Sequence, residues 1–306
     1  MELLKLNCIK GNTYYIKGGT NTGIYKFKDG SVLLIDPGLL GMRPKKIINL
    51  LEENNLKLKY IINTHEHGDH FEGGIVLLES NPDIKVFSSE EAKVFIENPN
   101  FAADYSMGGK ANEFLNLKLF NDKNKRIKVD EVIKEGSLEL NGEQFEIIKL
   151  SGHTEGSIGI LTSDKVLFVG DLFVASSMLS KFNLLLLYNV KEYLNSIEKI
   201  KDIDFEYMVI GHGKEIISKK AIDEVVKNHK ESVFKYINQV MELLEDRITM
   251  DNILKNILNN NDLSCNYKEY HYYRSTIVSI MSYLIDLKKV DYEIKNGEIL
   301  YYSKNV

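Results

Sequence analysis

The 306-residue sequence lacks three features: a long hydrophobic run, a secretion-type N-terminus and a surplus of positive charge. Its longest candidate apolar run, 184–188, is far below the roughly 20 residues that span a bilayer. The first residues have no long apolar segment of the signal-peptide kind. A net charge of −5 does not favour a polyanionic partner. We therefore expect a soluble, cytoplasmic protein that does not bind membranes.

Cysteine is also scarce. Cys8 and Cys265 have neither a ligand-like spacing nor the pattern of a disulfide framework, which suits a reducing compartment. We expect both to be small buried apolar side chains. The composition, 43% hydrophobic and 27% charged, is that of an ordinary globular protein. The length predicts one large domain, alone or with a small second one.

What the sequence does contain is a dense cluster of metal-ligand residue types at 64–70. His65, His67, Asp69 and His70 directly follow an expected apolar strand at 60–62. One helix cannot direct four side chains at these spacings to one point, but an irregular loop at the end of a strand can. His65 and His67 could hold one metal ion, while Asp69 and His70 reach a second.

Three later segments repeat this placement. His153 lies in a glycine-rich turn after the expected strand 145–150, Asp171 follows 166–169, and His212 follows 207–210. Each has neighbouring glycines that allow the backbone to turn sharply. Singly these signals are weak, but with the 64–70 cluster they complete two metal sites.

Short apolar segments separated by turn residues predict a strand-rich first part. The expected strands are 13–17, 23–27, 32–35, 60–62, 85–88, 126–132, 137–140, 145–150, 158–162, 166–169 and 207–210. Because hairpins dominate both halves, we expect an α/β sandwich covered by helices rather than a doubly wound sheet. The irregular segment 98–126 is expected to be either an active-site cover or an ordinary surface excursion.

The pattern changes after Gly213, where helices are expected at 219–245, 249–258 and 270–288, followed by a hairpin at 290–302. This order is that of a winged-helix unit, so we expect domains at 1–217 and 218–306. His229 is expected to be a solvated or capping residue on the first helix. Tyrosines between 267 and 273 could line the mouth of the active site or belong to the core.

The motifs together, His-x-His-x-Asp-His, Gly-His-Thr, Gly-Asp and Gly-His-Gly, resemble those of the metallo-β-lactamase superfamily over residues 1–217. The resemblance implies an αβ/βα sandwich with metal ions at one edge. It implies that Asp36 supports the site from beneath and that Asp171 bridges two ions. The first ion would be bound by His65, His67 and His153, and the second by Asp69, His70 and His212.

The residue types fit this chemistry. Two divalent ions ~3.5–4 Å apart can share a water molecule and lower its pKa, which yields a bridging hydroxide. Asp69 lies near that nucleophile in the family arrangement and is the expected catalytic residue, because it could orient the nucleophile or accept its proton. Nitrogen and oxygen ligands without thiolate suit zinc, iron or manganese, and we expect zinc.

Single residues weigh the branches of the superfamily. The diiron flavoproteins have Glu at the position of His67, which argues against a redox centre here. The lactonases have Tyr at the position of Val174, which makes a lactonase the weaker alternative. The turn from Gly152 to Ser157 is similar to that of glyoxalase II-like thioesterases, and the tail resembles that of the β-lactamase-like protein 2 endoribonucleases. Residues 218–306 contain 13 Lys+Arg and 13 Asp+Glu, without the basic surplus of a nucleic-acid module.

We therefore expect a hydrolase of small esters or thioesters. A metal-dependent endoribonuclease and a lactonase are the alternatives. The sequence leaves the oligomeric state open, a homodimer included.

Overall fold

The computed structural model describes residues 4–115, 126–181 and 184–304. Within these residues, a first sheet has seven strands in sequence order. They are β1 (Asn7–Lys10), β2 (Thr13–Ile16), β3 (Thr22–Lys26), β4 (Ser31–Ile35), β5 (Lys57–Ile62), β6 (Lys85–Ser88) and β7 (Glu131–Val132). Neighbours from β1 to β4 are antiparallel, whereas those from β4 to β7 are parallel. The expectation that hairpins dominate both halves was thus wrong for this sheet, because crossover helices connect β4, β5 and β6.

The second sheet has the order β13-β12-β11-β10-β9-β8. Its strands are β8 (Gly136–Leu140), β9 (Glu143–Lys149), β10 (Ile158–Thr162), β11 (Val166–Phe168), β12 (Tyr207–Val209) and β13 (Ile216–Ser218). A shared apolar core that includes Phe27, Leu33, Phe145 and Phe168 separates the two sheets. The sandwich predicted from the sequence is confirmed.

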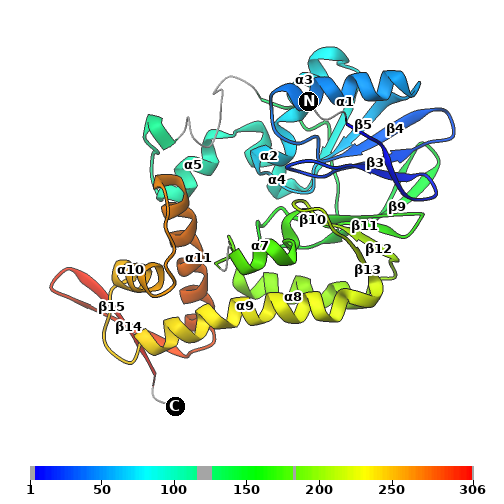
Figure 1. The fold of residues 1–306 in the computed structure, drawn as a ribbon. Helices are drawn as coiled ribbons and strands as arrows, with labels where there is room; N and C mark the ends of the chain where they lie inside the picture. The colour runs from blue at the N-terminus through cyan, green and yellow to red at the C-terminus, as the bar shows by residue number, and fades with distance from the viewer. Residues whose placement is uncertain (1–3, 116–125, 182–183, 305–306) are drawn as a thin grey trace.

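Helices cover both outer faces of the sandwich (Figure 1). The first sheet packs against α1 (Met42–Glu53), α3 (Gly73–Ser80) and α4 (Glu90–Glu97). The second packs against α8 (Val190–Lys199) and α9 (Ile222–Leu243). Strand β4 has all five residues buried, as expected for a strand covered on both faces. The layers therefore run helix, sheet, sheet, helix.

The C-terminal region continues from α9 through α10 (Met250–Asn260), α11 (Tyr267–Asp286) and a hairpin of β14 (Val290–Lys295) and β15 (Glu298–Ser303). Its apolar residues belong to the same core cluster as those of the second sheet. For example, this cluster contains both Leu167 of β11 and Ile280 of α11. Asn266 and Glu269 form a capping box that fixes where α11 begins. From there α11 lies beside α5 (Asn100–Met107). None of the helices in the described ranges is long and apolar enough to cross a membrane.

Three local expectations were wrong. The strand expected at 126–132 is reduced to β7. In contrast, segment 98–126 agrees with the expected active-site cover, since its helix α5 contributes to the pocket described below; residues 116–125 lie outside the described ranges. The cysteines are not buried: Cys8 is exposed and Cys265 is partly exposed. His229 is 2% exposed and joins α9 to the loop after Asp171. Its Nε2 accepts the Val174 N–H (3.1 Å) and its Nδ1 donates to the Val225 carbonyl (2.8 Å).

Candidate metal centre and active-site pocket

The ends of four strands, β5, β9, β11 and β12, bring the predicted ligands to one edge of the sandwich. The loop after β5 carries His65 and His67, and the one-turn helix α2 (Gly68–Phe71) carries Asp69 and His70. The second sheet supplies the other three. His153 lies between β9 and β10, Asp171 lies in the 3-10 turn Gly170–Leu172, and His212 follows β12. The carboxyl ends of neighbouring parallel strands meet at one edge, which explains how residues so far apart in sequence converge.

These seven side chains form two groups. One contains His65, His67, His153 and Asp171, and the other contains Asp69, His70 and His212; within each group the candidate ligand atoms lie within 4.8 Å of one another. Asp171 lies between them. Its Oδ2 is 3.6 Å from His153 Nε2 in the first group and 3.3 Å from His212 Nε2 in the second. The structure therefore brings all seven predicted residues together.

The second nitrogen of four imidazoles is held by a protein oxygen. His153 Nδ1 lies 2.9 Å from the Leu186 carbonyl, and His212 Nδ1 lies 2.5 Å from the Gly19 carbonyl. His65 Nδ1 is 3.0 Å from the Thr64 hydroxyl, and His70 Nδ1 is 2.8 Å from Asp36 Oδ2. Bonds of this kind fix the tautomer and direct the Nε2 lone pair inwards, as in metal-bound histidines. His67 is the exception, because its Nδ1 faces His153 Nε2 at 3.0 Å.

Asp36 holds the first loop in place beneath this cluster. The carboxylate is 2% exposed and accepts the Thr64 backbone N–H and the Thr64 hydroxyl, both at 2.7 Å, in addition to its contact with His70. Asp36 adopts a left-handed backbone with φ 55, a conformation that Asp and Asn tolerate better than most residues. It thus positions both the loop and one imidazole.

The shifts in pKa divide the clustered histidines into two classes. Burial lowers the pKa of His65, His67 and His153, that of His67 to about 3, so these rings are neutral ligands at pH 7. Burial also opposes charge on His70 and His212, but nearby Asp171 outweighs it and raises their pKa to about 10 and about 11. The Asp171 side of the cluster therefore attracts positive charge.

Close packing keeps this arrangement tight. A Cβ on Gly211, the residue before His212, would lie 2.1 Å from Asp171 Oδ1 and 2.8 Å from the His70 ring. Only glycine allows the backbone so near the two ligands. Among the residues that the structure describes, the buried His65 Nε2 and Asp171 Oδ1 also have no hydrogen-bond partner, although His70 Nε2 lies 3.2 Å from the latter. Buried polar atoms are normally paired, so unpaired nitrogen and oxygen atoms facing a cluster of ligands fit divalent cations.

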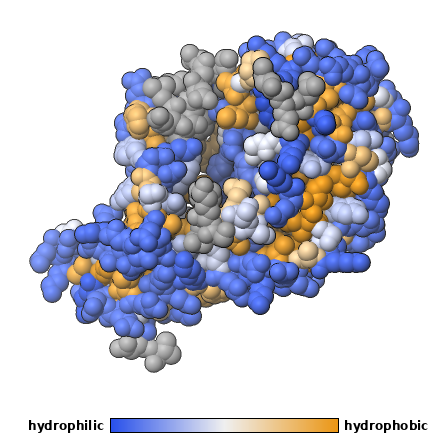
Figure 2. Space-filling view, in the orientation of Figure 1, coloured by the Kyte–Doolittle hydropathy of each residue, from blue (hydrophilic) through white to orange (hydrophobic). Residues whose placement is uncertain are grey.

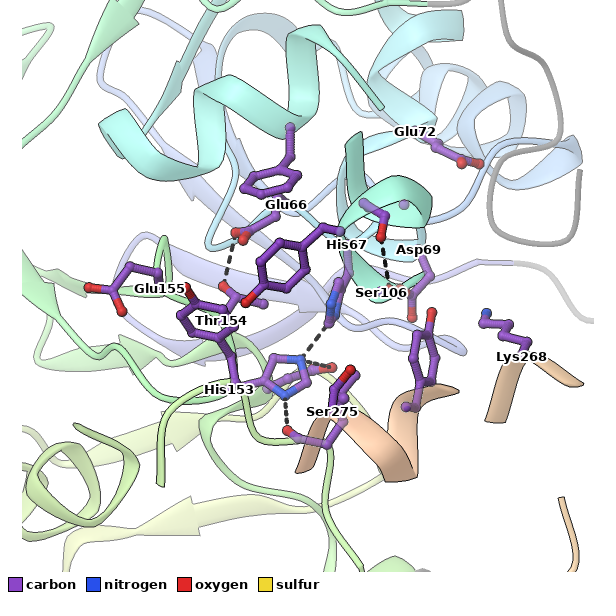
Figure 3. Close-up of a pocket in the computed structure, with 18 of the residues that line it drawn as sticks. Glu66, His67, Asp69, Glu72, Ser106, His153, Thr154, Glu155, Lys268 and Ser275 are labelled. Atoms are coloured by element: carbon purple, nitrogen blue, oxygen red, sulfur yellow. Dashed lines mark hydrogen bonds and ion pairs between the residues drawn. The ribbon is translucent and has the colours of Figure 1, made fainter. Parts of the chain in front are cut away.

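A cavity of about 600 Å³ opens beside the cluster and includes His67, Asp69, His153 and Asp171 in its wall. In the space-filling view, the face of the molecule is hollowed near its centre, between the sandwich and the C-terminal helices (Figure 2). Helix α11 contributes Lys268, Tyr272 and Ser275, which are spaced to share one helical face. Lys268 and Ser275 are labelled in Figure 3. The C-terminal region thus forms part of the pocket.

Sequence reasoning missed several pocket residues. Glu66 lies between two ligands and accepts the Thr154 hydroxyl at 2.9 Å (Figure 3), and burial raises its pKa to about 7. Lys268 was not singled out either, although its helical spacing with Tyr272 was a usable signal. Of the expected tyrosine cluster, Tyr272 lines the cavity, whereas Tyr267 and Tyr270 are exposed.

Comparison with protein families matches residues 15–212 to the model of the metallo-beta-lactamase superfamily. This chain belongs to the metallo-beta-lactamase superfamily. All seven predicted ligands of this superfamily member, His65 to His212, lie inside the matched range. The resemblance predicted from the motifs is confirmed.

Curated relatives of this metallo-beta-lactamase superfamily protein match part of its length. It is 29% identical to hydroxyacylglutathione hydrolase 1 of Vibrio vulnificus (strain YJ016) over 179 residues, 58% of this chain and 56% of that protein. It is 23% identical to the beta-lactamase-like protein 2 homolog of Caenorhabditis elegans over 240 residues, 76% of this chain and 69% of that protein. The match thus spans little more than half of the hydroxyacylglutathione hydrolase.

Among solved structures, a beta-lactamase domain protein from Burkholderia ambifaria has a TM-score of 0.75 at 13% identity. The similarity covers 96% of this chain and 91% of that one. At this identity the likeness shows a shared fold alone. That fold includes the C-terminal helices as well as the metallo-beta-lactamase sandwich.

Proposed function

We propose that this protein is a dinuclear metal-dependent hydrolase of small esters or thioesters. The observation that carries the proposal is the position of Asp171, whose Oδ2 lies within 3.6 Å of a histidine nitrogen from each of the two groups. A carboxylate so placed suits two adjacent cations. The hydroxyacylglutathione hydrolase relatives support the thioester class.

In this proposal His65, His67 and His153 would hold the first ion. Asp69, His70 and His212 would hold the second, with Asp171 placed to serve either group. Zinc is the ion we favour, because the donors are imidazole and carboxylate without thiolate. When bound, the pair would activate a water molecule and polarise the substrate carbonyl.

The remaining steps belong to the protein side chains. Asp69 lines the cavity, and its carboxylate lies 3.1 Å from His212 Nε2. Burial alone would raise the pKa of Asp69, but the His212 hydrogen bond and nearby His70 hold it below its usual range. It therefore stays ionised and can orient the attacking water. Water adds to the carbonyl carbon, the bond to the alcohol or thiol breaks, and the leaving group takes up the proton.

We propose that residues 218–306 form a second, winged-helix-like domain whose role is to close the pocket. The side chains of α11 that line the cavity support this role. A helix face used in this way is not free for a nucleic-acid groove, and the equal numbers of acidic and basic residues point the same way. The unpaired cysteines suit the reducing cytoplasm that we propose for it.

The test measures metal content and turnover together. Zinc-loaded protein should hold two ions per chain and hydrolyse members of an ester and thioester panel. His67→Ala and Asp171→Ala should lose ions and activity, whereas His271→Ala, outside both groups, should keep both. Two bound ions without activity on any ester or thioester would overturn the proposal, and salt-sensitive cleavage of single-stranded RNA would favour the endoribonuclease alternative.

A further inference from the structure

One side of the pocket is a wall of aromatic rings. Phe95 from α4, Tyr105 from α5 and Tyr188 before α8 all line the cavity. The Phe95 and Tyr105 ring centroids are 6.2 Å apart, and those of Tyr105 and Tyr188 are 5.5 Å apart. The three rings therefore form one continuous surface, which we call the aromatic wall.

The aromatic wall is unusually exposed for so apolar a surface. Tyr105 is 53% exposed and Tyr188 is 40% exposed. Leu186 and Ala102 extend the apolar lining next to these rings. An exposed apolar patch inside a cavity, with a few polar groups nearby, is the usual composition of a small-molecule site.

The segment that carries Tyr188 is held at a fixed place relative to the proposed metal centre. The Tyr188 N–H donates to the His153 carbonyl at 3.3 Å, and the Leu186 carbonyl holds His153 Nδ1 at 2.9 Å. On its other side the same segment is bonded to α11, where the Leu187 N–H donates to the Thr276 hydroxyl at 3.1 Å. Its position is therefore set by a predicted ligand and by the C-terminal region together.

We propose that the aromatic wall binds an apolar portion of the substrate, so that the preferred esters or thioesters carry an aliphatic chain or an aromatic ring. This inference rests on the proposed hydrolase function. The apolar group can belong either to the acyl part or to the leaving group. The wall lies beside the ligand cluster, where the scissile bond would be, and either side of that bond could extend towards it. Polar substituents of similar size would gain less from contact with the faces of the rings.

The experiment uses two homologous series of thioesters. One lengthens the acyl chain from acetyl to octanoyl with a constant thiol, and the other lengthens an alkyl thiol with a constant acetyl group. In the zinc-loaded wild type, kcat/KM should rise about two- to fourfold per methylene in one series until the wall is covered. In Tyr105→Ala/Tyr188→Ala that increase should largely disappear, so that kcat/KM becomes nearly independent of chain length.

Phe101→Ala is the matched control, because Phe101 is an aromatic residue of α5 that is 49% exposed and is not part of the cavity lining. It should retain the chain-length dependence. Calorimetry with non-hydrolysable thioether analogues supplies a readout that is independent of turnover, and affinity should follow the same series. Melting temperatures identify variants that fail to fold, and single Tyr→Phe changes, which preserve the apolar rings, should keep the dependence.

The two proposals fail differently. If the wild type hydrolyses thioesters with no dependence on either chain, or if the double variant behaves like Phe101→Ala, the aromatic-wall proposal is overturned and the hydrolase proposal stands. If no ester or thioester is hydrolysed, the hydrolase proposal fails. Thioether binding that rises with chain length in wild type but not in the double variant would then still support the wall.

Discussion

Asp36→Asn should weaken metal binding at the proposed second site, the one that includes His70. In the wild type Oδ1 accepts the Thr64 N–H, and Oδ2 contacts both the Thr64 hydroxyl and His70 Nδ1. Asparagine tolerates the left-handed backbone at this position, so the loop should keep its path. The amide nitrogen cannot replace Oδ1 without facing the Thr64 N–H, and it should therefore take the place of Oδ2.

In that place the amide donates towards His70 Nδ1. The ring must then carry its proton on Nε2, the atom that points at the cluster, where it blocks metal ligation. Loss of a bond of this kind typically costs about 10- to 100-fold in metal affinity. That range corresponds to roughly 1.4–2.8 kcal/mol. We expect the affinity of the proposed second ion to fall by at least this factor. The proposed first site should weaken as well, because the Thr64 hydroxyl that contacts Asp36 Oδ2 also holds His65 Nδ1.

Chelator competition combined with elemental analysis measures both affinities. The control is Asp164→Asn, because Asp164 Oδ2 also accepts a backbone N–H and a threonine hydroxyl, from Asn12 and Thr13 at 2.8 Å, but contacts no histidine. It should bind two ions normally. If Asp36→Asn retained two ions with wild-type affinities, the proposed role of Asp36 in fixing the His70 tautomer would be refuted.

Three further outcomes follow from the structure. Gly152→Ala should destabilise the fold by roughly 2 kcal/mol more than Gly136→Ala in urea unfolding. Both glycines have positive φ, but only a Cβ at Gly152 would lie 2.3 Å from the Tyr193 backbone. Equal losses of stability in the two variants would contradict this explanation. Burial lowers the pKa of His229 below 6.5, so its neutral ring stabilises the protein above that pH and the benefit disappears as pH falls through the lower folded pKa. The gap in unfolding free energy between wild type and His229→Gln should shrink from pH 8 to pH 5, and a constant gap would exclude this role. Removing zinc with a chelator should lower the free energy of unfolding by about 2.7 kcal/mol per site when free zinc had been 100 times Kd, and an unchanged melting temperature would argue against structural metal binding.

The sequence predicted all seven members of the ligand cluster because each follows a short apolar strand, in a segment that contains glycine. That is a local pattern, and strand ends at one edge of a sheet converge in space. It predicted less well where long-range packing decides the outcome. Half of the first sheet is parallel, since β4 pairs with β5 and β5 with β6. Helices separate these strands in the sequence, so no short turn motif predicts which strands pair.

Buried polar residues were also hard to predict. His229 has no partner motif in the sequence, yet it is enclosed because α9 packs against the second sheet and the loop after Asp171 supplies a backbone donor. Glu66 and Lys268 reach the pocket from loops and helices that are about 200 residues apart.

The sequence by itself determined the superfamily and the residue types at the metal centre, because motif spacing and strand periodicity are local properties. Only the tertiary structure decided what surrounds that centre. It placed Asp171 between the two groups, fixed the second nitrogen of four histidines, and brought α5 and α11 together as the walls of one pocket. These features depend on packing between segments that are distant in the chain, and such contacts leave no periodic trace in the sequence.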